Sequence, residues 1–276
     1  MAMTLAHLGP PGTYTEAAAL AYAAQYGETE LFPYGSIAQT LQAVARSETD
    51  VGVVPVENSI QGSVAMTLDT IWLLDNLHIQ QALVLPIQHV LISLSDTLEA
   101  VRTVYSHPQA LGQCQRWLET FLPAAQRIAA PSTTDALTSL QSDRQAAVIS
   151  SRRAAQLYHL PILAENLNDY PDNCTRFWVL GPETTTQGSY ISLAFAAPAN
   201  VPGALVNPLQ VLAEGQINMS RIESRPTKRL LGEYIFFVDI EGDLRDRAIQ
   251  NALEEFARHT ASFKIFGNYD VATISG

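Results

Sequence analysis

The sequence has few cysteines, few basic residues and no long apolar run. Its two cysteines, Cys114 and Cys174, lack CxxC spacing, so neither a disulfide framework nor a metal site is expected. Lys and Arg number 16 against 27 Asp and Glu, for a net charge of −11. Nucleic acid and anionic membranes attract basic faces, so neither is expected as a partner. No stretch approaches the ~20 apolar residues of a membrane span. The first 30 residues have no signal-peptide pattern, which predicts a cytoplasmic protein.

The chain does have enough apolar residues for two domains. Of its 276 residues, 47% are hydrophobic and 16% are charged, a composition typical of packed cores. Short apolar runs alternate with helical patterns over residues 1–181, which predicts α/β layers with largely parallel strands. Two strands, Val84–Ser93 and Thr175–Leu180, are interpreted as crossings between two lobes, and a small ligand is expected in the cleft between them. The expected lobes are residues 1–80 with 170–181, and residues 84–168.

A second, smaller domain is predicted after a polar linker. Gly181–Gly188 is rich in turn residues and has no apolar period, as linkers usually are. Residues 189–276 then show a βαββαβ succession, which is the ferredoxin-like order. The expected elements are strand Tyr190–Ala196, helix Pro208–Glu214, strands Asn218–Ser224 and Glu233–Ile240, helix Leu244–His259 and strand Phe263–Tyr269.

A hydroxyl and a guanidinium stand side by side at the start of an apolar strand. Thr175 and Arg176 precede Phe177 in this run, and strand ends facing a crevice are where open α/β sheets hold ligands. Arginine suits a carboxylate, and a neighbouring hydroxyl can donate to a departing oxygen. Taken alone, the pair is compatible with any carboxylate-binding site.

Further polar residues cluster where other strands end. Glu57, Asn58 and Ser59 follow the buried strand Val51–Pro55, an arrangement typical of a binding loop or of an ordinary polar loop before a helix. Gln113 shares a helix face with Gln109, so both point either at a ligand or at water. His107 nearby is interpreted as structural or exposed rather than as a general base.

Four turns carry a capping-box pattern. The hydroxyls either satisfy the first N–H groups of their helices or mark helix N-termini that open onto one cleft and bind an anion. Four such turns favour a polyanionic ligand, although capping alone remains an alternative at each. The pairs are Thr13 with Glu16, Ser36 with Gln39, Ser106 with Gln109, and Ser132 with Asp135.

Together these segments resemble the prephenate dehydratase family over essentially the whole chain. The resemblance rests on four segments that follow one another in the family's order: Gly9–Glu16, Val54–Gly62, Ser106–Cys114 and the Thr175–Phe177 triplet. The C-terminal region resembles an ACT domain in its Gly203-Ala204-Leu205 and Glu223-Ser224-Arg225-Pro226 elements. The resemblance implies a periplasmic-binding-protein-like (type II) two-lobed domain at 1–181 and an ACT domain at 189–276. No fused chorismate mutase is expected.

The family resemblance also implies roles for particular residues. Prephenate would lose water and carbon dioxide to give phenylpyruvate, with Thr175 at the leaving hydroxyl, Arg176 at a carboxylate and no cofactor. L-phenylalanine would be the effector, and the protein a homodimer or homotetramer. The remaining expected substrate-binding residues are Glu57, Asn58, Ser59, Ser106, Gln113, Thr13, Ser36 and Phe177. The expected effector-binding residues are Gly203, Ala204, Leu205, Glu223, Ser224, Arg225 and Pro226.

Two alternatives remain open at this point. Arogenate dehydratase would differ only in the substrate side chain, an amine in place of a keto group. A two-lobed sensor for amino acids or anions, without catalysis, would also use helix N-termini but would not need Thr175 next to Arg176.

Overall fold

The first lobe is built on a seven-stranded mixed sheet. The computed structural model describes residues 2–274, and the strands of this sheet lie in the order β16-β5-β11-β3-β1-β2, with β4 paired to β3. Strands β3 and β11 are almost continuously apolar because both of their faces are covered. Helix α1 packs on one face, and helices α2 and α3 pack on the other. The elements are β1 (Met3–Leu8), α1 (Tyr14–Ala23), β2 (Thr29–Tyr34), α2 (Ile37–Ala45), β3 (Val51–Asn58), β4 (Gly62–Ser63), α3 (Ala65–Leu73), β5 (His78–Pro86), β11 (Cys174–Gly181) and β16 (Val271–Thr273).

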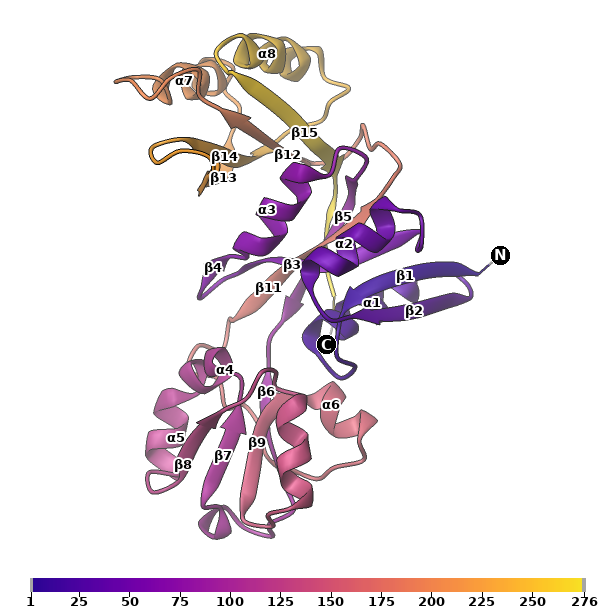
Figure 1. Cartoon of the computed structure of the whole chain (residues 1–276), viewed down its shortest axis with the longest axis vertical. Coiled ribbons are helices and arrows are strands. Elements are labelled where there is room, and N and C mark those ends of the chain that lie inside the picture. Colours follow the sequence, from indigo (N-terminus) through magenta and orange to yellow (C-terminus); the bar gives the residue numbers. More distant parts are fainter. Residues whose placement is uncertain (1, 275–276) are drawn as a thin grey trace.

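The second lobe is a five-stranded sheet in the order β10-β6-β9-β7-β8. Two chain crossings join it to the first lobe, and Figure 1 shows it at the lower end of the molecule. The elements are β6 (His89–Ser93), η1 (Leu98–Ala100), β7 (Thr103–Ser106), α4 (Pro108–Gln113), α5 (Gln115–Phe121), β8 (Gln126–Ala129), η2 (Asp135–Gln141), β9 (Ala146–Ser151), α6 (Arg152–Leu157) and β10 (Ile162–Ala164).

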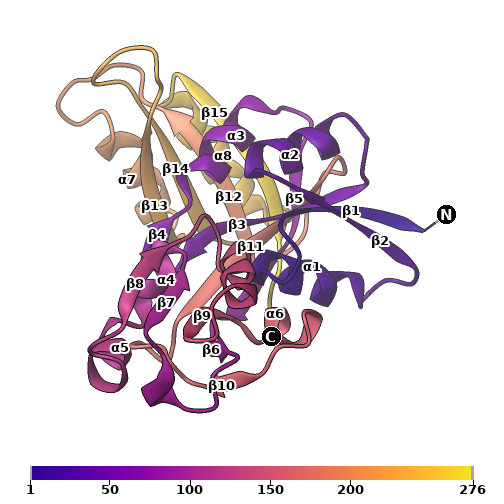
Figure 2. The same ribbon diagram turned by 60° about the horizontal axis from the view of Figure 1, so that its bottom comes forward.

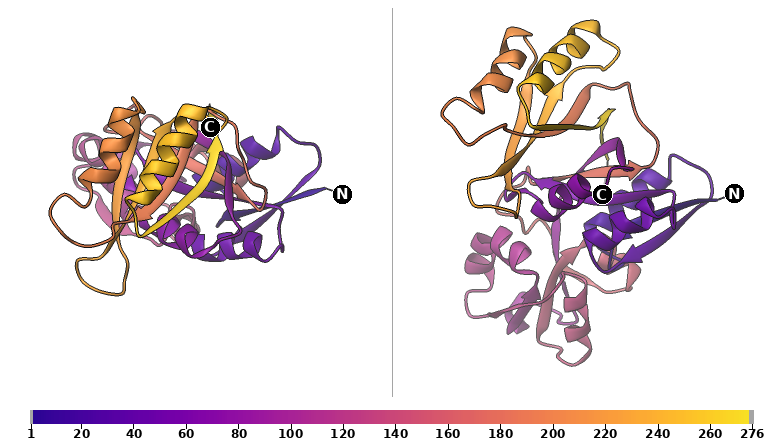
Figure 3. Two further views of the ribbon diagram at one scale, coloured as in Figure 1. Left: turned by 90° about the horizontal axis from the view of Figure 1, so that it is seen from above. Right: turned by 45° about the horizontal axis from the view of Figure 1, so that its top comes forward.

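The C-terminal domain confirms the ferredoxin-like prediction. Its sheet has the order β13-β14-β12-β15, and both helices cover the outer face, as Figure 1 and the right-hand view of Figure 3 show. The inner face packs on the first lobe, where Phe237 and Phe266 join Trp178 in one apolar cluster. The elements are β12 (Tyr190–Ala196), α7 (Val206–Glu214), β13 (Met219–Pro226), β14 (Tyr234–Glu241), α8 (Arg247–Arg258) and β15 (Ser262–Tyr269).

Several sequence-based expectations need correction. The predicted strand Val84–Ser93 is two strands in different lobes, because β5 ends at Pro86 and the chain crosses to β6 over residues 87–88. The first-lobe sheet therefore extends past the expected boundary at residue 84. The largely parallel sheet is also wrong, since β11 runs antiparallel to both of its neighbours and β6 runs antiparallel to β9.

The last described strand returns to the first lobe. β16 pairs in parallel with β5, from Val271 opposite Ala82 to Thr273 opposite Val84, and Figure 2 shows this end of the chain near α1 and α6. The expected C-terminal domain of residues 189–276 therefore includes a strand, Val271–Thr273, that belongs to the first-lobe sheet. No helix within residues 2–274 is long and apolar enough to cross a bilayer.

Candidate active site

A cavity of about 530 Å³ lies between the two lobes. The first lobe contributes the β1–α1 turn, the N-terminus of α2 and the ends of β3 and β11, while the second lobe contributes β6 and the starts of α4 and η2. Among the described residues that line it there is no lysine or arginine. Polar and aromatic lining residues include Thr13, Tyr14, Thr15, Asn58, His89, His107, Gln109, Gln113, Ser132, Thr133, Asp135, Thr175 and Phe177.

Asn58 fixes the orientation of the Thr175 hydroxyl. The backbone N–H groups of Ile60 and Gln61 both donate to Asn58 Oδ1, at 3.2 Å each. The amide nitrogen of Asn58 is thereby identified as a donor, and it lies 3.0 Å from Thr175 Oγ1 and 3.1 Å from Cys174 O. Since the threonine oxygen accepts this bond, its own hydrogen is free to point into the cavity.

The same polarity continues through a buried chain of side chains. Asn58 donates to Asn173 Oδ1 at 2.8 Å, and Asn173 Nδ2 donates to Gln113 Oε1 at 3.0 Å. The Gln113 oxygen then accepts from His89 Nε2 at 2.9 Å. Burial lowers the pKa of His89, although the bond to Gln113 opposes this, so a neutral ring carries its hydrogen on Nε2. His89 Nδ1 lies 3.0 Å from the Tyr14 hydroxyl oxygen, and that hydroxyl donates to Gln88 O at 2.7 Å.

Arg176 lies on the opposite face of β11 from Thr175. Successive residues of a strand point to opposite faces, and Arg176 and Glu57 are both absent from the described cavity lining. Arg176 Nη2 lies 2.6 Å from Glu57 Oε2 and 2.9 Å from Asp239 Oδ2 of the ACT domain. Burial alone would lower the pKa of the guanidinium, but these two carboxylates outweigh it and raise the pKa. The expectation that Arg176 and Glu57 meet a ligand in the cleft does not fit this placement.

Besides Thr175, five hydroxyls were expected in or near the cleft, and all five make local hydrogen bonds. Ser132 accepts from Asp135 N at 2.9 Å, as its pattern predicted, and lines the cavity. Thr13 and Ser36 cap α1 and α2, as their patterns predicted, and only Thr13 is among the described lining residues. Ser106 is not a cap, because its buried hydroxyl donates to Ile149 O at 2.6 Å and His107 caps α4 instead. Ser59 Oγ accepts from Cys174 N at 3.0 Å and ties the loop after β3 to the start of β11.

Phe177 lines the cavity and also packs with the α1 side of the sheet. His89, Tyr14 and Asn173 also belong to the site, and none of the three was predicted from the sequence. Asn173 directly precedes the Cys174–Phe177 segment, so its place in the sequence could have indicated that it belongs to the site. His89 lies within an apolar run, and nothing in the sequence around it indicates a site residue.

The expected effector residues lie on two segments of the ACT domain. Gly203 has a φ of +84°, which only glycine adopts without strain, and forms the turn before α7. On β13 the residues alternate, so that Ser224 and Pro226 are exposed. The Arg225 guanidinium makes two hydrogen bonds to Asp69 on α3, at 3.0 and 3.2 Å, and is therefore engaged with the first lobe. Ala204, Leu205 and Glu223 are half-buried.

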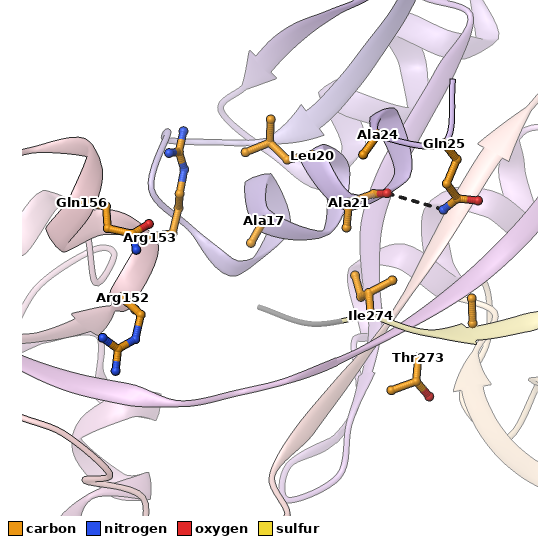
Figure 4. A pocket seen from close by; sticks show the side chains of 11 residues that line it. Ala17, Leu20, Ala21, Ala24, Gln25, Arg152, Arg153, Gln156, Thr273 and Ile274 are labelled. Atoms are coloured by element: carbon orange, nitrogen blue, oxygen red, sulfur yellow. Dashed lines mark hydrogen bonds between the residues drawn. The ribbon is translucent and has the colours of Figure 1, made fainter. Parts of the chain in front are cut away.

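A second cavity, of about 710 Å³, lies among α1, α6 and the end of β16 (Figure 4). Its small side chains come from α1, and Figure 4 shows the two arginines of α6 on the other side. Both arginines are paired with acids, Arg152 with Glu165 at 2.7 Å and Arg153 with Glu16 at 3.4 Å. The cavity lacks the Thr175 network, so the interlobe cavity is the candidate site.

Comparison with known proteins agrees with this architecture. A family model described as Prephenate dehydratase matches residues 5–185, and one described as ACT domain matches residues 192–258. A bifunctional chorismate mutase/prephenate dehydratase of Neisseria gonorrhoeae is 41% identical over 99% of this chain and 75% of its own length. A prephenate dehydratase of Lactococcus lactis subsp. cremoris is 36% identical over 99% of both chains.

A solved structure extends the likeness to three dimensions. The prephenate dehydratase of Arthrobacter aurescens, in complex with L-Phe, superposes with a TM-score of 0.87 at 32% identity, covering 97% of this chain and 90% of that one. The two family models, the relatives that match 99% of this chain and the shared fold all indicate the same family. The chain therefore belongs to the prephenate dehydratase family, as an enzyme of that class whose catalytic region is followed by an ACT domain.

Proposed function

We propose that this enzyme converts prephenate to phenylpyruvate, carbon dioxide and water in the interlobe cavity, with Thr175 as the catalytic donor. The observation that carries this proposal is the hydrogen bond from Asn58 Nδ2 to Thr175 Oγ1. It leaves the threonine proton available to a ligand oxygen at the cavity wall.

The reaction needs help mainly at the departing hydroxyl. The bond between the ring and its carboxylate breaks, and that electron pair joins the ring π system as the C–O bond to the hydroxyl breaks. One proton is taken up, so a dianion gives carbon dioxide, water and a monoanion. A threonine hydroxyl is too weak an acid to give up its proton unaided. Thr175 therefore acts as a pre-oriented hydrogen-bond donor that stabilises the developing charge on the leaving oxygen.

The substrate carboxylates would meet helix ends rather than side-chain cations. The described lining has no Lys or Arg, but residues at the N-termini of α1 and α2, including Thr13, Thr15, Gly35 and Ile37, lie at the cavity. The N–H groups and positive dipole ends of helices favour anions. This supports two carboxylate subsites on the first-lobe side of the cleft.

The catalytic proposal is tested by following phenylpyruvate formation from prephenate in the wild type, Thr175→Ala and Thr175→Ser. Thr175→Ala should lower kcat by about 10²–10³-fold, the usual cost of losing one oriented donor, whereas Thr175→Ser should retain much of the rate. Equal rates for the wild type and Thr175→Ala would remove Thr175 from its role. Turnover of arogenate in the same assay distinguishes the arogenate alternative. Ligand binding without turnover of either substrate would support the sensor alternative.

We also propose that L-phenylalanine is the effector and that it binds at the Gly203–Leu205 turn and the outward side of β13. The exposed Ser224 and the left-handed turn at Gly203 support this placement, since both leave backbone groups open to a small zwitterion. Calorimetry with L-phenylalanine should give binding that Ser224→Ala weakens. Ser220→Ala, on the same strand and the same side, is the matched control. Absence of any heat or change in activity with the wild type would overturn the effector assignment.

The edge of the ACT sheet supports a homodimer. β13 is an edge strand, and its outward residue Ile222 is 40% exposed. Leu231 in the following turn and Tyr234 at the start of β14 are exposed as well. Exposed edge strands with apolar side chains tend to pair with another chain. Sedimentation should give a dimer or a dimer of dimers, and Ile222→Glu should shift it toward monomer. A wild type that sediments as a monomer would contradict this assignment.

A further inference from the structure

The ACT domain makes direct ionic contact with the strand that carries Thr175. Asp239 lies on β14, its side chain is only 1% exposed, and its Oδ2 lies 2.9 Å from Arg176 Nη2. The Arg176 side chain is 15% exposed and also contacts Glu57 on β3. One guanidinium therefore joins two adjacent strands of the catalytic sheet to a strand of the ACT domain.

A second arginine completes this contact from the ACT side. Arg221 on β13 donates through Nε to Asp239 Oδ2 at 2.9 Å and through Nη1 to Ser63 Oγ at 3.2 Å. Its guanidinium carbon lies 5.7 Å from the centre of the Trp178 ring. Trp178 is on the same face of β11 as Arg176, two residues further along. The interface thus reaches β11 at two successive positions of one face.

The charges in this group balance. Arg176 and Arg221 supply two positive charges, and Asp239 and Glu57 supply two negative ones. Buried ion pairs depend on full pairing, because removal of one partner leaves an uncompensated charge in a poorly solvated site. The arrangement is therefore sensitive to any movement of β14 relative to β11.

The alternation of β13 gives the ACT domain two functional sides. Arg221 and Arg225 face the first lobe, where they contact Ser63 and Asp69. Ile222 and Ser224 face outward and are exposed. A ligand or partner chain that moves the outward side of β13 also moves Arg221, and with it the shared Asp239 carboxylate.

We propose that Asp239 is a positioning residue for catalysis: through its ion pair with Arg176 it holds β11 in register, and so couples the state of the ACT domain to the orientation of Thr175. Arg176 is then a coupling residue between domains rather than a substrate ligand. The expected effect on kcat rests on the proposed role of Thr175. The expected effect of the ion pair on β11 does not depend on that role.

The test uses the full chain with Asp239→Asn, Arg176→Met and the double variant. Coupling networks of this kind change the interaction between sites by about two- to thirtyfold. Asp239→Asn should therefore reduce the effect of L-phenylalanine on kcat by a factor in that range, and lower kcat more than it changes KM. Because the two groups act as a pair, the double variant should resemble each single variant. Additive losses, or an unchanged phenylalanine response in folded Asp239→Asn, would overturn the proposal.

Hydrogen exchange supplies a readout that does not depend on the substrate. The peptide containing residues 174–181 should exchange faster in Asp239→Asn than in the wild type, and phenylalanine should alter its exchange in the wild type only. Asp75→Asn is the matched control, because Asp75 joins Lys264 across the same domain boundary without contacting β11. If Asp239→Asn does not fold, Arg176→Lys keeps the charge but loses the fork that meets two carboxylates, and it should show the same faster exchange. Exchange unchanged from the wild type in these variants would refute the coupling, whatever the activity assay gives.

Discussion

The two faces of strand β11 differ in the groups that they contact: one faces the interlobe cavity and the other faces the ACT domain. The face that carries Thr175 looks into a cavity whose described lining has neither lysine nor arginine, and neutral amides and an imidazole order its hydrogen bonds. The face that carries Arg176 is an ionic contact with the ACT domain. Adjacent residues in one strand therefore meet the cavity and the ACT domain separately, because a strand presents alternate side chains to opposite sides.

This comparison bears on where specificity for a dianion arises. A fixed cation in the cleft would hold a carboxylate strongly in both the ground state and the transition state, which lowers KM without raising kcat. In the mechanism proposed above, helix ends and a pre-oriented hydroxyl would place partial charges where the leaving oxygen develops its charge. The formal charges of Arg176, Arg221, Asp239 and Glu57 lie instead at the interface with the ACT domain.

The largest expected effect comes from reversing the polarity of the hydrogen bond to Thr175. In Asn58→Asp the side chain has almost the same shape, but a carboxylate can only accept, so the Thr175 proton turns away from the cavity. We expect kcat to fall by about 10²–10³-fold. Asn76→Asp, which makes the same substitution elsewhere in the first lobe, should retain activity. Full activity in folded Asn58→Asp would show that the orientation of the threonine hydroxyl is unimportant.

A smaller effect is expected at the contact that closes the cleft. Gly12 has a φ of +86°, and an added Cβ would lie 3.2 Å from Ala154 Cβ of the second lobe. Its carbonyl also accepts from Ser151 Oγ at 2.6 Å. Gly12→Ala should lower the free energy of unfolding by about 1–3 kcal/mol, as measured with urea. Gly27→Ala is the control, since open space surrounds that position. Equal losses of unfolding free energy in the two variants would show that the surroundings of Gly12 do not make it more sensitive to substitution than Gly27.

The smallest expected effect concerns the pH dependence of stability. Burial lowers the pKa of His89 in the folded protein, whereas the unfolded chain titrates near about 6.5. The unfolded state therefore binds more protons below that pH, and stability is lost as pH falls through about 6.5 toward the folded pKa. His7 and His78 have pKa values lowered mainly by burial, so they contribute in the same direction.

His89→Gln should reduce this loss without abolishing it. The free energy of unfolding, measured at about pH 7.5 and about pH 5.5 on either side of the ordinary histidine pKa, should change less in the variant than in the wild type. A variant at position 89 with the full wild-type loss would show that His89 is not buried in its neutral form.

Much of the local structure was predictable, and the exceptions have physical causes. The strand Thr103–Ser106 and the strand Tyr190–Ala196 have the expected bounds, because turn residues punctuate them clearly. The end of β5 at Pro86 and the crossing to β6 lie within a continuous apolar run, so the hydrophobic periodicity could not reveal them. β16 is too short to have a pattern of its own and is stabilised by its ladder with β5. Ser106 fits a capping pattern, but the nearby Ile149 carbonyl takes its hydroxyl.

The sequence by itself determined the family, the two-domain order and the position of Thr175 at a strand start, since these depend on residue types in local spacing. Only the tertiary structure decided what surrounds each side chain. Thr175 and Arg176 look like one paired site in the sequence, but the pleat of β11 sends the first to the cleft and the second to Asp239, 63 residues away along the chain. Local patterns specify which way a residue faces relative to its neighbours, whereas packing of distant segments specifies what it meets there.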